Sequence, residues 1–231
     1  MKRLVQPEWL DTLPPGDPRA RRSRHDLRRV NRCMGHAPIL VSALEQSWPE
    51  RAPENITELG AGDGNFLLSV AQKCSTRWPA VQATLLDLQN NVSAETLAGF
   101  AALGWRTDVV VADVFNWPLT AGAGGVVVAN LFLHHFQDDQ LAELLRLIAA
   151  RAEVFIALEP RRAAWPLFCS HWLWAIGCNE VTRHDAVISV RAGFSGAELS
   201  ALWPDSRQWR LTEHSRGAFS HLFIAQKLIA G

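Results

Sequence analysis

Apolar residues in the first part of the chain recur at the spacing of a helix. Leu27, Val30 and Met34 form one stripe, and a second stripe follows a Gly-His-Ala-Pro break. This spacing predicts two helices between about residues 23 and 46. The preceding residues 6–22 are rich in Pro, Asp and Arg, so we expect them to form an extended, loosely ordered arm.

Beyond these helices, short apolar runs alternate with amphipathic stretches. The apolar runs, which predict strands, lie at residues 56–59, 83–88, 109–114, 125–131 and 154–158. The amphipathic stretches, which predict helices, lie at residues 66–73, 94–103 and 140–150. Strands and helices that alternate in this way build βαβ units and a parallel sheet. Because the strands consist mostly of Val, Leu and Ile, helices are expected to cover both faces of that sheet.

The alternation ends after the fifth predicted strand. Residues 161–194 form an aromatic-rich insert with a mostly helical pattern. A further helix is expected to start at Ser195 as the N-cap, with Glu198 three residues later completing a capping box. Two closing strands are then predicted at residues 210–214 and 218–226.

The composition limits the partners and compartments that we expect. Lys+Arg and Asp+Glu each number 23 among 231 residues, and this neutrality gives no electrostatic reason for a nucleic-acid partner. The four cysteines form no C-x-x-C pair, which argues against a cysteine zinc site or a disulfide framework. No apolar run resembles a secretory signal or is long enough to span a bilayer. The expected location is the cytoplasm.

Three alternating glycines follow the first predicted strand. Gly60, Gly62 and Gly64 permit a tight turn and let a ligand approach the backbone where a helix starts. Glu58 precedes this turn and Asp63 lies inside it. The carboxylate inside the turn would repel a pyrophosphate but suits a cationic ligand. A dinucleotide motif would place its third glycine where this chain has an asparagine, which disfavours an NAD(P) oxidoreductase.

This motif resembles the first motif of the class I S-adenosylmethionine (SAM)-dependent methyltransferases, in which an acidic residue precedes G-x-G-x-G. Asp87, Asp113 and Asn130, at the tips of the next three strands, agree with the resemblance. The likeness is nearest to bacterial small-molecule methyltransferases of secondary metabolism and quinone-type pathways. It implies an α/β, Rossmann-like fold with a seven-stranded, mostly parallel sheet. N-terminal cap helices, a helical insert after strand five and an antiparallel last strand are also expected.

The resemblance implies SAM as the cofactor and S-adenosylhomocysteine (SAH) as its product. Asp87 is expected to bind the ribose hydroxyls, and Asp113 and its neighbour are expected to hold the adenine. The full set expected to bind the cofactor is Glu58, Gly60, Ala61, Gly62, Asp63, Gly64, Asp87, Leu88, Asp113, Val114, Asn130 and Leu131. A single domain is expected, with an arm and cap helices at 1–50, a SAM-binding core at 51–160, an acceptor lid at 161–194 and a closing helix and strands at 195–231.

Two histidines are the catalytic candidates. His134 and His135 follow the fourth predicted strand, at the carboxyl edge of the sheet where α/β sites lie. Methyl transfer to an oxygen needs a base, and histidine suits this role near neutral pH. His134 is the one expected to face the cleft. The alternative is that one or both cap the local turn or contact solvent. We expect no metal ion.

Side chains of the insert are candidates for contact with the acceptor. They are Trp165, Phe168, His171, Trp172, Arg183 and His184. An aromatic wall suits an apolar acceptor, although packing onto the core is the alternative for each Trp. In the cap helices, Arg29 or Asn31 is expected to reach the carboxylate of the cofactor.

These features predict O-methylation of an apolar, phenolic or polyketide-like small molecule. C-methylation of an activated ring carbon is one alternative, and a SAM-binding protein without catalysis is another. Methylation of RNA or protein is disfavoured, because the fourth strand lacks an Asn-Pro-Pro-Tyr motif. The expected partner is a small-molecule acceptor, not a nucleic acid, and a homodimer is left open.

Overall fold

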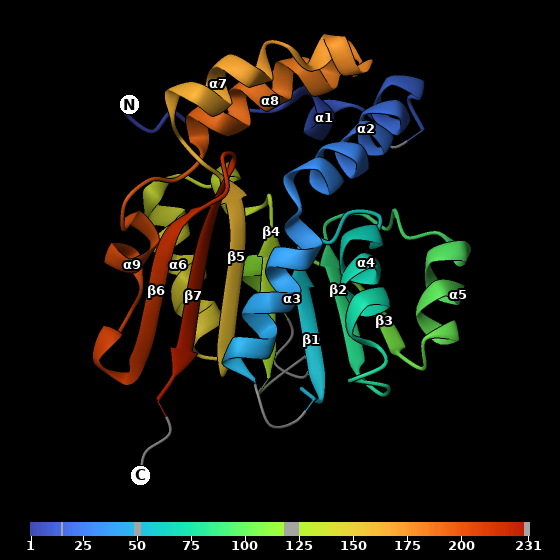
Figure 1. Ribbon diagram of the computed structural model, residues 1–231, viewed down its shortest axis with the longest axis vertical. Coiled ribbons are helices and arrows are strands. Elements are labelled where there is room, and N and C mark those ends of the chain that lie inside the picture. Colours follow the sequence, from blue (N-terminus) through green and yellow to red (C-terminus); the bar gives the residue numbers. More distant parts are fainter. Residues whose placement is uncertain (15, 49–51, 118–124, 229–231) are drawn as a thin grey trace.

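The computed structural model describes residues 1–14, 16–48, 52–117 and 125–228. Within these residues, seven strands form one sheet in the order β3-β2-β1-β4-β5-β7-β6 (Figure 1). The strands are β1 Asn55–Leu59, β2 Gln82–Asp87, β3 Arg106–Val111, β4 Val126–Asn130, β5 Val154–Pro160, β6 Trp209–Arg216 and β7 Ser220–Lys227. Strands β1 to β5 pair in parallel, and β7 runs antiparallel to both β5 and β6. The predicted α/β fold class is therefore confirmed, including the antiparallel last strand.

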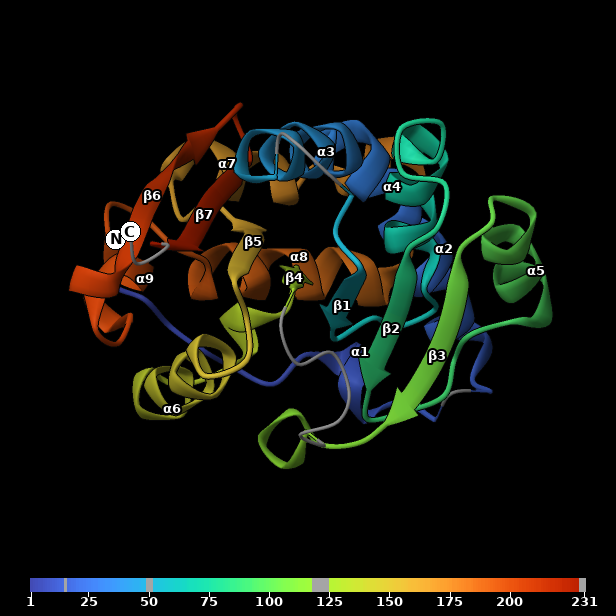
Figure 2. The ribbon, with the colours of Figure 1, turned by 90° about the horizontal axis from the view of Figure 1, so that it is seen from below.

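Helices cover both faces of the sheet (Figure 2). One face carries α3 (His36–Ser47), α4 (Asn65–Cys74) and α5 (Ala94–Ala102), and the other carries α6 (Asp138–Ala149) and α9 (Glu198–Leu202). Each face has its own apolar core, and the strands contribute alternate side chains to the two. The buried strands read as continuous apolar runs because neither face meets water.

A helical cap lies above the carboxyl ends of the parallel strands (Figure 1). It comprises α1 (Trp9–Thr12), α2 (Pro18–Met34), α7 (Ala164–Ser170), the 3₁₀ turn η3 (Leu173–Ile176) and α8 (Glu180–Ala192). The N-terminal and insert segments hold each other through buried polar groups. The N–H of Asn179 donates to Asp26 at 2.8 Å, and the hydroxyls of Thr182 and Ser23 lie 2.9 Å apart. Within the described residues, no helix is long and apolar enough to cross a membrane.

Two local predictions are wrong. Residues 6–22 do not form a loosely ordered arm, because they contain α1 and the start of α2, where Asp17 caps the helix and Pro18 opens it. The hydroxyl of Ser195 does not cap a helix, since it accepts a hydrogen bond from Arg162 at 2.8 Å and α9 begins only at Glu198. The second half of that capping box is present, as the N–H of Ser195 donates to Glu198 at 3.0 Å.

The observed strand boundaries differ from the predicted ones by a few residues. The third strand ends at Val111, and Val114 lies in the 3₁₀ turn η1 (Val114–Asn116), because the carboxylate of Asp113 accepts from Phe115 N–H and turns the chain. The predicted domain boundary at residues 50 and 51, and the last three residues of the closing region, lie outside the described residues.

Candidate active site

The glycine loop connects β1 to α4 at the edge of the sheet beneath the cap. Gly60 adopts a φ of 66° and Gly62 a φ of 56°, values that only glycine takes without strain. A Cβ at Gly60 would clash with the ring of Phe132, whereas a Cβ at Gly62 would meet open space. The N–H of Gly62 donates to Asp87 at the tip of β2 at 2.9 Å. The loop is therefore fixed to β2, with its backbone at Gly62 open to a ligand.

Three carboxylates surround this loop. Glu58 is buried, and its Oε2 has no hydrogen-bond partner in the described part of the chain. Burial, and then the nearby carboxylates of Asp63 and Asp87, raise the pKa of Glu58 well above its ordinary value. Arg28 of α2 reaches down to Asp63 at 3.5 Å. A buried carboxylate with one unpartnered oxygen and acidic neighbours suits a ligand that brings its own positive charge.

The neighbouring strand tips supply the remaining features of a nucleoside site. Asp87 accepts from the N–H of Gln89 at 2.9 Å, so both of its oxygens organise local backbone. Leu88 is 70% exposed and Val111 56% exposed, which leaves apolar surface beside that carboxylate. Such surface suits the face of an adenine ring. Asp113 is exposed, whereas the side chain of Val114, also expected to bind the cofactor, packs in the core.

At the tip of β4, the side chain of Asn130 is used by the protein itself. Its Oδ1 lies 2.6 Å from Nδ1 of His36, whose Nε2 lies 2.8 Å from Ser220 Oγ. Burial lowers the pKa of His36 to about 4, so this histidine is neutral. Leu131 then adopts a left-handed φ of 52°, which turns the chain into the next segment.

His134 lies at the centre of a buried polar network on the 3₁₀ turn η2 (Leu133–His135). Its Nδ1 is 2.7 Å from Glu159 at the end of β5, and its Nε2 is 3.3 Å from Glu8 of the N-terminal segment. Burial opposes protonation, but the two carboxylates outweigh it and raise the pKa of His134 to about 9. Glu159 also accepts from the N–H groups of Phe132 and Leu133, at 3.0 and 2.8 Å.

The N-terminal segment closes over this turn. Glu8 accepts from the hydroxyl of Ser189, and burial, which alone would raise its pKa, is overcome by His134, so that the pKa falls to about 2. His135, whose side chain is 27% exposed, has Nδ1 3.4 Å from Asp11. We call Glu8, His134, His135 and Glu159 the histidine cluster.

Asp185 of α8 anchors the N-terminal segment. Its carboxylate accepts from the N–H groups of Trp9 and Leu10 at 2.9 and 3.0 Å. The ring of Trp9 stacks on His184 with centroids 3.8 Å apart. The segment that carries Glu8 is thus held against the lid by specific contacts.

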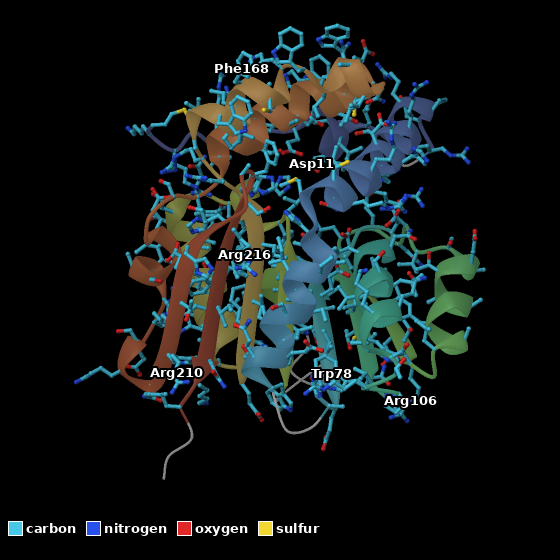
Figure 3. The ribbon with its side chains drawn as sticks, viewed as in Figure 1. Asp11, Trp78, Arg106, Phe168, Arg210 and Arg216 are labelled. Carbon is cyan, nitrogen blue, oxygen red and sulfur yellow. The ribbon has the colours of Figure 1, made fainter. Side chains whose placement is uncertain are left out.

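The structure brings few of the expected acceptor residues to the histidine cluster. His184 stacks on Trp9, the residue after Glu8, and so lies near the cluster. His171 and Arg183 are exposed. The three aromatic candidates are exposed and their rings contact each other in sequence order, with Phe168 on the outer side of α7 (Figure 3). They are Trp165, Phe168 and Trp172, with exposed fractions of 59, 56 and 52%.

Arg29 and Asn31, the two residues of α2 expected to reach the cofactor, have other surroundings in the structure. Arg29 contacts Asp26 and donates to the carbonyl of Ile176. The Oδ1 of Asn31 is buried and has no partner within the described residues. The basic residue that reaches the glycine loop is Arg28.

Comparisons with known proteins fit this geometry. A family model described as a methyltransferase domain matches residues 56–152. The fold resembles the plantazolicin methyltransferase BpumL in complex with SAH, with a TM-score of 0.67, 13% identity and 92% of each chain covered. Residues 56–152 therefore match a methyltransferase domain, and the chain shares the fold of a methyltransferase structure. A second similar structure is the mitomycin 7-O-methyltransferase MmcR, with a TM-score of 0.62, 20% identity, and coverage of 94% of this chain and 60% of that one.

Curated relatives of the methyltransferase domain act on small molecules. Ajmaline N-methyltransferase of Rauvolfia serpentina is 25% identical over 142 residues, which are 57% of this chain and 48% of the relative. The 2,7-dihydroxy-5-methyl-1-naphthoate 7-O-methyltransferase of Streptomyces carzinostaticus is 30% identical over 118 residues, 51% of this chain and 34% of that protein. The chain thus spans less than half of each relative's length, and their acceptors are not transferred to it.

The methyltransferase domain implies SAM as the cofactor, and the residues at the strand tips fit it. Glu58, with its unpartnered oxygen, matches the positive charge of the methionine portion, and the open backbone at Gly62 lets that portion approach. Asp87 and the exposed Leu88 suit the ribose and the adenine. These residues lie where the sequence motifs predicted them, and their contact with the cofactor remains a prediction.

The histidine cluster and its surroundings contain residues that the sequence analysis did not single out. Glu159 directly follows the fifth predicted strand at 154–158, and an acid at a strand tip is itself a signal for a site at this edge of the sheet. Glu8 and Asp11 gave no comparable signal, because each meets the histidines only through the folding of a distant segment.

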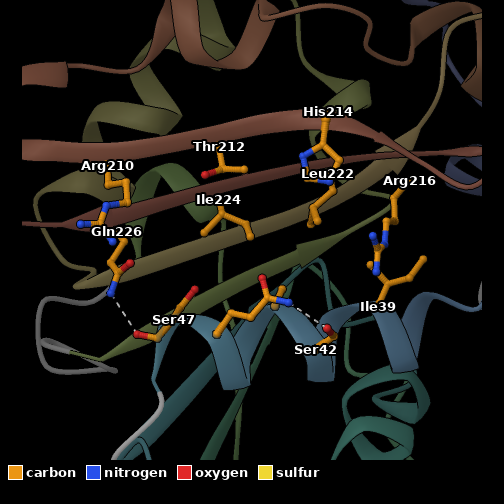
Figure 4. Close-up of a pocket in the computed structure, with 12 residues that line it drawn as sticks. Ile39, Ser42, Ser47, Arg210, Thr212, His214, Arg216, Leu222, Ile224 and Gln226 are labelled. Carbon is orange, nitrogen blue, oxygen red and sulfur yellow. Dashed lines mark hydrogen bonds between the residues drawn. The ribbon is translucent and has the colours of Figure 1, made fainter.

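A separate groove lies between α3 and strands β6 and β7 (Figure 4). It encloses about 230 Å³ and is bordered by Arg210, His214 and Arg216 of the outer strand. The amide of Gln226 donates to the carbonyl of Ser47 across it at 3.0 Å. None of its lining residues belongs to the histidine cluster or the expected cofactor set, so we give it no part in methyl transfer.

Proposed function

We propose that this chain transfers a methyl group from SAM to a hydroxyl of an apolar, phenolic or polyketide-like small molecule. Residues 51–160 bind the cofactor in a single domain whose arm and insert, at 1–50 and 161–194, cover the acceptor. The closing region at 195–231 completes the sheet. The neutral net charge favours a small-molecule acceptor over a nucleic acid. A homodimer remains a prediction.

The observation that carries this proposal is the histidine cluster beside the glycine loop. Phe132, which opens the turn containing both histidines, lies against Gly60. The cluster and the expected cofactor loop are therefore adjacent. A hydroxyl acceptor must lose its proton during transfer, and imidazoles with carboxylate partners are suited to that task.

The two histidines have different roles in this proposal. His135 is partly exposed and accepts the hydroxyl proton. His134 is buried, with both ring nitrogens beside carboxylates, and acts as a positioning residue that fixes the turn. SAM supplies an already activated methyl group, so the remaining task of the protein is to orient the acceptor and to exclude water.

The histidine cluster also supports oxygen over nitrogen as the methylated atom. The curated relatives include one N-methyltransferase and one O-methyltransferase, so they do not decide the question. A neutral amine needs no base before it attacks a methyl group. The presence of imidazoles and carboxylates next to the cofactor loop is therefore better explained by a hydroxyl acceptor.

Calorimetry followed by an acceptor screen tests the proposal. The protein should bind SAM and SAH but not NADH, and should then form SAH in the presence of phenols or alkylpyrones. Mass spectrometry and NMR of the product assign the methyl group to oxygen or carbon. Binding of SAH without turnover across the panel would indicate a SAM-binding protein. A carbon-bound methyl group would replace O-methylation by C-methylation.

A further inference from the structure

We propose that Glu8, His134 and His135 bind a divalent transition-metal ion, with Zn²⁺ as the best fit. One ligand atom from each of these residues lies within 4.8 Å of the other two. Nε2 of His134 and Oε1 of Glu8 are 3.3 Å apart. Two ligands at about 2.1 Å from a tetrahedral zinc ion lie roughly 3.4 Å apart, so this pair already has the spacing of a shared ion.

Glu159 supports His134 as a metal ligand. Its carboxylate lies 2.7 Å from Nδ1 of His134 and is itself fixed by the backbone N–H groups of Phe132 and Leu133. A proton held on Nδ1 by this carboxylate leaves Nε2, which faces Glu8, with its lone pair. Metal-binding histidines in proteins commonly donate their second nitrogen to a carboxylate in this way.

The charges around the two rings also favour a cation. Glu8 and Glu159 contact His134, and Asp11 contacts His135 at 3.4 Å. When His134 gives up its Nε2 proton to bind an ion, the buried carboxylates of Glu8 and Glu159 lie beside a neutral ring, with the exposed carboxylate of Asp11 near His135. The neighbouring guanidinium of Arg3 is engaged by Asp138 and by backbone carbonyls. A divalent ion would offset most of this negative charge.

The donor set selects the class of ion. Two imidazoles and one carboxylate form a zinc-type site with an open coordination position. Mg²⁺ and Ca²⁺ prefer oxygen ligands throughout and fit less well. The open position suits a hydroxyl oxygen of a small molecule, whose pKa a bound ion lowers. This catalytic part rests on the proposed function and would make His135 a ligand in place of a free base, whereas ion binding stands independently.

Metal titration of the chelator-treated protein tests the site. Zn²⁺ should bind with one-to-one stoichiometry in calorimetry, and Co²⁺ in its place should give visible absorption bands of a low-symmetry site. Glu8→Gln and His135→Gln should each weaken binding by on the order of 100-fold. The matched control is His25→Gln, which removes an exposed imidazole of α2 and should leave binding unchanged.

The outcomes separate this inference from the proposed function. Asp87→Asn should lose SAH binding but keep Zn²⁺, because Asp87 is not a ligand of the site. Absence of stoichiometric binding in the original protein would overturn the inference, and the Glu8–His134 contact would then be an ion pair only. Zn²⁺ affinity equal to that of the original protein in either Glu8→Gln or His135→Gln, with thermal unfolding showing that the variant is folded, would also overturn the three-ligand site.

Discussion

The cofactor loops and the histidine cluster lie side by side but are built in opposite ways. The contact that fixes the glycine loop, Gly62 to Asp87, spans 25 residues of sequence, whereas the contact between Glu8 and His134 spans 126. In the cofactor loops, Glu58 keeps a buried oxygen without a protein partner in the described chain. In the histidine cluster, both nitrogens of His134 and the carboxylate of Glu159 are engaged.

This difference shows which half of the site depends on the cap. Short loops between adjacent strands build the expected cofactor side, as in the contact from Gly62 to Asp87. The acceptor side requires the N-terminal segment to dock on α8 through Asp185. Changes on one side should therefore affect one property and spare the other.

The largest expected effect is on the rate of methyl transfer. His135→Gln should lower kcat by on the order of 10²- to 10⁴-fold, because it removes the accessible imidazole that activates the acceptor. Affinity for SAH should stay unchanged in calorimetry, since the cofactor loops do not contain this residue. His25→Gln serves as the control and should retain full activity. Equal rates for the two variants would remove His135 from the chemistry.

A smaller effect, confined to the cofactor side, is expected from Asp87→Asn. The loss of a charged acceptor for two hydrogen bonds should weaken SAH binding by on the order of 100-fold. Calorimetry measures this directly, with Asp139→Asn on α6 as an exposed control. An unchanged affinity would show that the ribose does not contact β2.

The third prediction concerns His36, the first residue of α3, which contacts Asn130 of β4 and Ser220 of β7. The pKa of His36 is about 4 in the folded protein, below the ordinary value of 6.5. As the pH falls from 6.5 to 4, the unfolded chain binds a proton that the folded chain refuses, so the free energy of unfolding should fall by roughly 3 kcal/mol. Urea unfolding across this range measures the slope.

His36→Gln should flatten that slope, because glutamine does not titrate. The comparison uses the slope and not the absolute stability, since the substitution also changes the contacts with Asn130 and Ser220. The same slope in both proteins would assign the acid sensitivity to another group.

The smallest effect is expected at the aromatic residues of the lid. Phe168→Ser and Trp172→Ser remove exposed rings, so KM for the acceptor should change by no more than about twofold. The free energy of unfolding should stay within about 0.5 kcal/mol. A tenfold rise in KM would instead bring this aromatic surface into the acceptor site.

The fold and the cofactor half could be predicted because their signals are local. The alternation of apolar strands and amphipathic helices, and the glycine loop after β1, are each contained in short stretches of sequence. The predicted arm at residues 6–22 failed for the opposite reason. Its Pro and Asp suggest a loop, yet Asp17 and Pro18 act as a helix start once α2 packs on α8.

The sequence by itself determined the parallel sheet and the tight turn at Gly60 to Gly64, because periodicity and glycine conformation act within a few residues. The antiparallel final strand was implied only by the family resemblance. Only the tertiary structure decided that Glu8 and Glu159 meet at His134, and that Phe168 lies on the outer side of the lid. Buried charges are tolerated only beside partners, and those partners come from whichever distant segments the packing of the cap brings to the sheet edge.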